Sequence, residues 1–182
     1  MRIRVALIAG LFAGAPQLAH AQVRVGRDSS TRLNRFGRDL VYGTGMGLIY
    51  AGIDQWRNDP AQWGSGWDGY RKRTLSNIGE FVIQESVTEG LAAVLQRPLD
   101  YQPCPCHDFS DRMSWAFRQS VTDVTRHGHP IALPRILGAY VGSFAQASWR
   151  PATSNRAQVA VVNGTLSLAI GAGINVFHEL RR

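Results

Sequence analysis

The chain has 182 residues and a formal net charge of +7. Its length suits one ordinary domain with enough chain to bury a core. Lys72 is the only lysine, so nearly all the positive charge is arginine, which suits anionic lipid, acidic polysaccharide or an acidic partner.

The first 21 residues have the layout of a secretory signal peptide. Arg2 and Arg4 form a basic head, residues 5–14 are an uncharged apolar run, and Ala19 and Ala21 are the small residues of a cleavage site. The apolar run is too short to span a bilayer as a mature helix. We therefore expect export, cleavage after Ala21, and a location in the periplasm or at the outer membrane. Export, rather than charge, argues against nucleic acid as a partner.

Residues 22–37 are polar, carry arginine at intervals and show no apolar periodicity. This composition predicts a flexible polar leader or a short surface strand. The character of the chain changes at Arg38, and we expect a single helical domain over residues 38–182.

Apolar residues recur at helical spacing in five segments of this domain, which predicts an all-α fold, a compact bundle of about five helices. The segments run from about Arg38 to Trp56, Thr74 to Gln96, Ser110 to His127, Leu133 to Trp149 and Gln158 to Leu180. In the third segment we expect the row Met113, Phe117, Val121 and Val124 to face inward. The last segment also alternates as a strand would, so an exported β-barrel is the alternative fold.

Small residues form a second face on several of these helices. The candidate packing positions are Gly43, Gly47, Gly138, Gly142, Gly164 and Gly171, with Ala160 one turn before Gly164. Glycine inside a helix costs roughly 1 kcal/mol relative to alanine, so its repeated use indicates that helix backbones approach closely. This pattern joins helices in lipid and also occurs in tightly packed soluble bundles. Residues 157–177 carry no charge and could cross a membrane, although their polar side chains are costly against lipid.

Aromatic and basic side chains gather between the first two helices. The candidates for contact with a membrane or an envelope glycan are Trp56, Trp63, Trp67, Tyr70, Arg71, Lys72 and Arg73. Indole rings at headgroup depth beside cations are typical of an interfacial anchor. The same rings could stack on sugars, or fold back over the end of the bundle as an ordered loop.

Residues 58–70 read NDPAQWGSGWDGY. This segment, from Asn58-Asp59-Pro60 to Gly69-Tyr70, resembles a motif of a group of small exported bacterial helical proteins. The likeness continues through residues 97–101, the cysteine pair and residues 175–179. The resemblance implies export and a shared fold, and it brings no activity, cofactor or catalytic residue.

The two cysteines lie in a Cys-Pro-Cys-His run. Cys104, Cys106 and His107 could hold a metal, with His127 and His129 as further ligands. In an oxidising compartment the cysteines could instead form a disulfide, within the chain or between chains, or stay as free thiols. These options define the alternative function, a periplasmic metal-binding or thiol-redox protein. Haem attachment is excluded because it needs Cys-x-x-Cys-His.

No motif in the sequence indicates an enzyme. Glu85 and Glu89 lie one helical turn apart and could serve acid–base chemistry, but pairing with an arginine such as Arg97 favours a structural ion cluster. The nucleophile-elbow and zincin spacings are absent from the sequence. We therefore expect an exported, non-enzymatic, membrane-associated envelope protein. Its expected partners are a membrane or anionic envelope surface, with a second copy or another envelope protein as further options, and the sequence indicates no particular cofactor.

Overall fold

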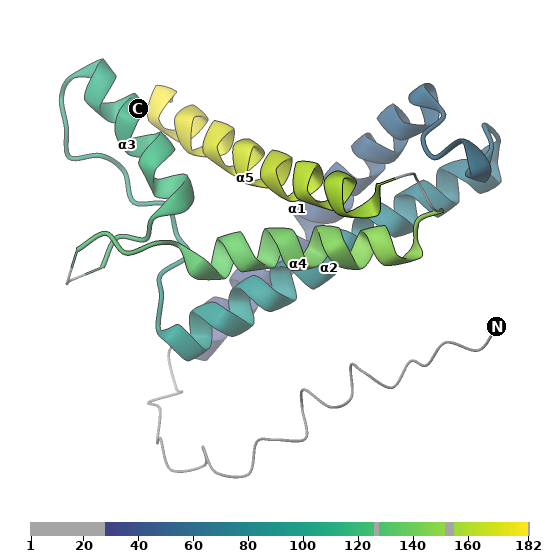
Figure 1. The fold of residues 1–182 in the computed structure, drawn as a ribbon. Coiled ribbons are helices and arrows are strands. Elements are labelled where there is room, and N and C mark those ends of the chain that lie inside the picture. Colours follow the sequence, from purple (N-terminus) through teal and green to yellow (C-terminus); the bar gives the residue numbers. More distant parts are fainter. Residues whose placement is uncertain (1–27, 126–127, 152–154, 182) are drawn as a thin grey trace, which may run out of the picture. The chain divides into compact units, whose positions relative to one another are not determined.

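The computed structural model describes residues 28–125, 128–151 and 155–181. Its helices are α1 (Asp28–Arg57), α2 (Trp67–Leu95), α3 (Phe109–Val121), α4 (Leu133–Trp149) and α5 (Arg156–Leu180), with the short 3-10 helix η2 (Ala61–Trp63) before α2 (Figure 1). The prediction of an all-α bundle of about five helices is confirmed. The last segment, whose alternating apolar residues would also fit a strand, is helical from Arg156 to Leu180.

Helix α1 begins earlier than its apolar periodicity does. Residues 28–37, which the composition predicts to be a flexible polar leader, are helical. Arg35 in this stretch forms ion pairs with Asp100 at 2.6 Å and Glu89 at 3.7 Å, so a polar sequence gains tertiary partners that composition does not reveal. The expected signal peptide, its cleavage point after Ala21 and residues 22–27 lie outside the described residues.

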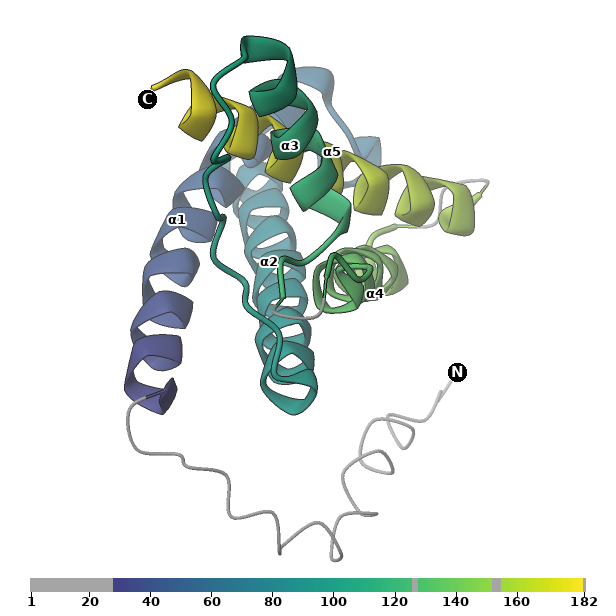
Figure 2. The same ribbon diagram turned by 90° about the vertical axis from the view of Figure 1, so that its left-hand side faces the viewer.

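Helix α4 lies against α2 on one side and α5 on the other, and α3 packs on α5 (Figure 2). Helix α3 ends at Val121, short of the predicted His127, because the chain turns back there. The backbone amides of Asp123 and Ala132 donate to the carbonyls of Pro130 and Val121 at 2.8 and 2.9 Å. These bonds join the end of α3 to the start of α4.

Small residues make the closest helix contacts. A Cβ added at Gly142 on α4 would lie 3.0 Å from the carbonyl oxygen of Glu80 on α2, and one at Gly138 would lie 2.8 Å from that of Gln84. On α1, Gly43 faces the ring of Phe81 and Gly47 faces Ile78, while Gly164 on α5 faces Tyr140 on α4. Gly171 differs from this expectation, because a Cβ added there would meet open space.

The interior consists of small and polar side chains. The buried apolar residues are Ala51, Ala92, Cys104, Ala116, Ala132, Ala139, Ala160 and Ala172, and the buried polar residues are Arg73, Ser76, Thr88, Gln119, Asp123, Ser143, Gln146 and Glu179. The large apolar side chains are exposed or half-buried. Phe117 and Val121, which the periodicity of α3 predicts to face inward, are 58% and 45% exposed. These two residues face outward because Ala116 and Gln119 occupy the face that packs, whereas Met113 and Val124 of the same predicted row are half-buried.

The glycine contacts give a prediction with a matched control. Gly142→Ala should lower the free energy of unfolding by about 1–3 kcal/mol, because the added carbon would overlap α2. Gly171→Ala, the same change at a position with open space, should raise it by up to about 1 kcal/mol through helix propensity. Thermal unfolding of both variants in detergent tests this, and equal shifts in the two would contradict the packing described.

Candidate functional site

The guanidinium of Arg73 lies inside the connection between α1 and α2 and binds its oxygen atoms. It is fully buried, with 0% of the residue exposed. Its nitrogens donate to the backbone carbonyls of Asp59 (2.9 Å), Pro60 (2.9 Å) and Gly64 (2.7 Å), and to the side-chain oxygens of Gln55 (2.6 Å) and Asn58 (3.3 Å). These acceptors include backbone carbonyls just beyond the C-terminal end of α1, where the helix dipole favours a cation. The charge is therefore stabilised by five oxygen contacts, four of them at the end of α1.

This arrangement explains the residue types of the 58–70 segment. Asn58 follows α1 with φ of 53°, a left-handed conformation that asparagine tolerates, and Gly64 has φ of 74°. A Cβ on Gly69 would lie 2.6 Å from the carbonyl oxygen of Trp63 and 2.7 Å from Nη1 of Arg73, so only glycine leaves room for the guanidinium. The segment is thus a tight turn built around one buried cation.

The expected contact residues near this turn divide into two groups. Trp56 and Trp67 are 86% and 72% exposed, and Arg71 and Lys72 are also exposed. Tyr70 is half-buried and stacks on Trp67. The other group turns inward: Trp63 lies under the guanidinium of Arg150, whose Cζ is 5.7 Å from the ring centroid, and Arg73 is buried, which corrects its assignment as a surface contact.

The exposed and buried faces of α4 differ in the size and polarity of their side chains. Its exposed residues include Leu133, Leu137, Val141, Phe144 and Trp149, spaced along one outward stripe. Its buried residues are Pro134, Gly138, Ala139, Gly142, Ser143 and Gln146. The large apolar side chains therefore face out and the small and polar ones face in, the reverse of a soluble amphipathic helix.

The same reversal holds on α1, and in part on α2 and α5, where about half of the large apolar residues are exposed and the rest are half-buried. Gly43, Gly47 and Ala51 are buried on α1, whereas most of its large apolar residues are exposed. In residues 41–56, 74–95, 133–149 and 157–177, all of which the structure describes, no exposed residue carries a charge. We call these four stretches the apolar belt. The glutamates of α2 fall within it but are only partly exposed, on the side facing neighbouring helices.

Polar side chains bridge the helices inside the belt. Ser143 Oγ donates to Glu80 Oε1 at 2.6 Å, and Gln146 Nε2 donates to Asn77 Oδ1 at 3.0 Å, both joining α4 to α2. Ser167 Oγ on α5 donates to Gln84 Oε1 on α2 at 2.9 Å. Hydrogen bonding of this kind removes most of the cost of burying these groups.

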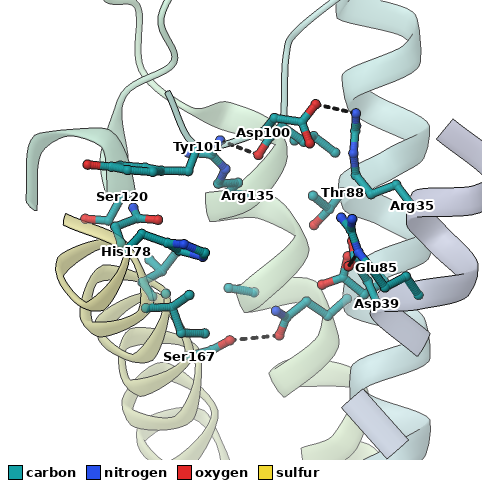
Figure 3. A pocket seen from close by; sticks show the side chains of 18 residues that line it. Arg35, Asp39, Glu85, Thr88, Asp100, Tyr101, Ser120, Arg135, Ser167 and His178 are labelled. Carbon is teal, nitrogen blue, oxygen red and sulfur yellow. Dashed lines mark hydrogen bonds and ion pairs between the residues drawn. The ribbon is translucent and has the colours of Figure 1, made fainter. Parts of the chain in front are cut away.

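Two cavities lie among these polar groups. The first, of about 340 Å³, has Arg35, Asp39 and Glu85 on one side and Tyr101 and His178 on the opposite side (Figure 3). The second, of about 620 Å³, lies between α1 and α5, with Asp54, Asn77, Glu80 and Gln146 among its polar lining. Gln84 and Ser167 line both cavities, and their hydrogen bond lies where the cavities meet.

A second buried charge holds the C-terminal end of α5. Glu179 is 0% exposed, and its Oε1 accepts from the hydroxyl of Tyr101 at 2.7 Å and the backbone amide of Cys104 at 2.8 Å. Arg112 Nε donates to Oε2 at 3.1 Å. Glu179 thus ties α3 and the cysteine segment to α5, a role that its position in the sequence does not signal.

Cys104 and Cys106 form a disulfide, and their Cα atoms are 5.1 Å apart. Disulfide sulfurs are not thiolate ligands. His107 is exposed, and His127 lies outside the described residues. Within the described part of the chain, no group of three His, Cys, Asp or Glu side chains is placed to hold a metal ion. The metal site stays a prediction for the reduced chain.

Asp123, in the turn between α3 and α4, has an unusual environment. Both carboxylate oxygens are buried without a hydrogen-bond partner among the described residues, and Nη1 of Arg135 is 3.9 Å from one of them. Burial raises the pKa of Asp123 above its ordinary value, although the charges of Arg135 and Arg97 act in the opposite direction. Asp123 lines neither cavity, so we assign it no part in a site.

No family model, curated protein or solved structure matches the chain. The resemblance of residues 58–70 to exported bacterial proteins therefore stays a prediction. Their geometry gives these residues a structural explanation, because the turn and its glycines enclose Arg73.

Replacing Arg73 should destabilise the protein far more than replacing its exposed neighbour. Arg73→Leu leaves several buried oxygens without a donor, and we expect a loss of about 3–5 kcal/mol in the free energy of unfolding. Arg71→Leu, which alters an exposed side chain two residues away, should change it by less than about 0.5 kcal/mol. Thermal unfolding in detergent measures both, and similar losses would show that Arg73 does not organise the turn.

Proposed function

We propose that the protein is an exported, non-enzymatic component of the cell envelope, embedded in a membrane through the apolar belt. The observation that carries this proposal is the reversal on α4, where Leu137, Val141 and Phe144 face out and Gly138 and Gly142 face in. Lipid chains solvate large apolar side chains, and helices in lipid associate through small residues and interhelical hydrogen bonds. In water the same exterior would be a large continuous apolar patch.

Helix length supports the proposal. Helix α5 is the one described helix that is long and apolar enough, by composition, to cross a membrane. Helix α2 carries three glutamates between residues 74 and 95, yet the exposed residues of this stretch are uncharged. This stretch rises about 32 Å, close to the roughly 30 Å of hydrocarbon in a bilayer.

The residues where α1 ends and α2 begins also support the proposed embedding in a membrane. Trp56 and Trp67 are exposed where α1 ends and α2 begins, next to the exposed cations Arg57, Arg71 and Lys72. Aromatic and basic side chains together are typical of the boundary between hydrocarbon and headgroups. We propose that this end meets an anionic surface.

The proposal is tested by placing a charge on the outward stripe of α4. An aspartate near the centre of a membrane helix costs about 3 kcal/mol, so Leu137→Asp and Val141→Asp should reduce the fraction of protein that carbonate leaves in the membrane pellet. Native protein should stay in the pellet. The control is Ser114→Asp, an exposed position on α3 outside the belt, which should behave as the native chain does.

A soluble bundle would respond in the opposite way. In water an exposed Leu→Asp change is neutral or improves solubility, and the native protein would leave the membrane fraction with carbonate. Release of the native chain, as a monomer or as an oligomer that covers its own apolar belt, would contradict the proposal.

A further inference from the structure

We infer that the two cavities form one path for protons and small monovalent cations, with Glu80, Gln84 and Glu85 along it, and that the path is closed at the Gln84–Ser167 hydrogen bond. The inference rests on the proposed embedding in a membrane. Ionisable and polar groups inside a membrane protein are costly, and where they persist they commonly line the route of an ion or a proton. Glu80, Glu85 and Gln84 are such groups, all on the inner side of α2.

The cavities lie end to end along α2. The larger one is lined by α2 residues 77–84, and the smaller one by residues 84–88 and the 99–101 segment beyond the helix. Along α1 the lining of the two cavities runs from Arg35 to Arg57, a rise of about 33 Å that is comparable to the hydrocarbon thickness. The far end of each cavity is lined by exposed residues: Trp56, Arg57 and Asp59 at one end, and Arg38, Asp100 and His178 at the other.

The charges along this path favour a cation at its centre. Glu80 and Glu85 flank Gln84, one in each cavity. Four of the five arginines that line the cavities pair with an aspartate: Arg150 with Asp54 at 3.1 Å, Arg35 with Asp100 at 2.6 Å, Arg38 with Asp39 at 3.4 Å and Arg135 with Asp123 at 3.9 Å. The fifth, Arg57, lies at the exposed end of the larger cavity. Carboxylates in a narrow passage select cations.

The closure consists of two neutral side chains. Ser167 Oγ donates to Gln84 Oε1 at 2.9 Å, linking α5 to α2 across the path. On the α4 side there is no space around them, since a Cβ added at Gly142 would lie 2.9 Å from Gln84 Cβ. Passage therefore requires this hydrogen bond to open.

The test uses the full chain reconstituted in phosphatidylcholine–phosphatidylglycerol vesicles, with an internal pH dye for proton flux and an electrode for potassium release. Gln84→Ala/Ser167→Ala should raise the flux of protons, or of protons and potassium, about tenfold over the native chain, the factor that corresponds to a hydrogen bond of about 1.4 kcal/mol. Adding Glu80→Gln/Glu85→Gln should return the flux toward the native level. Ser86→Ala, which alters an exposed hydroxyl on the same helix, should have no effect.

Two further readouts make each outcome decisive. Trapped calcein must stay inside the vesicles, because its loss would mean a non-selective leak and would overturn the inference. Vesicle flotation with carbonate washing reports insertion separately. Inserted protein with no rise in either flux overturns the path and leaves the proposed function standing, whereas failure to insert overturns both.

Discussion

The close approach of helix backbones at glycine and alanine determines what each helix can present to the outside. Where Gly138 and Gly142 face α2, there is no space between the helices for a large side chain. The large apolar residues of α4 must then lie on its other face. On α1, Gly43 and Gly47 instead leave room for the half-buried α2 side chains Phe81 and Ile78. The fully buried interior is left mainly to alanines and to polar groups that can bond to one another across short distances.

Such an interior provides less hydrophobic driving force in water than a core of large side chains would, because many large apolar residues stay exposed on folding and the others are only half-buried. In a bilayer the forces that hold such helices together are different: lipid covers the outer faces, and close packing and interhelical hydrogen bonds stabilise the bundle. Two of the fully buried charges, Arg73 and Glu179, fit this scheme because each is surrounded by hydrogen-bonding partners and each fixes an irregular segment next to a helix end. The apolar belt and the polar interior thus have one physical origin.

The helices and their glycine faces could be predicted from the sequence, because periodicity and small-residue spacing are local properties. The direction in which each face points could not: the row of Phe117 and Val121 is equally regular whether it faces a core or the outside of the bundle. The sequence alone groups Arg73 with its exposed neighbours, because its acceptors are backbone carbonyls and side-chain amides that no sequence pattern displays. The cavities and the partners of Glu179 depend on residues far apart in the chain, such as Gln84 and Ser167, so only the tertiary structure brings them together.

The outward orientation of α4 in lipid is tested most directly by the accessibility of single cysteines. In a chain whose own cysteines are replaced by serine, cysteine would be placed in turn at Leu137, Val141, Phe144 and, as a reference, Ser114. A membrane-impermeant maleimide would then be added to vesicles opened by freezing and thawing, so that both membrane faces are reached. Embedding of the apolar belt predicts strong labelling at position 114 and little at the three α4 positions until detergent is added. Equal labelling at all four positions in intact lipid would contradict it.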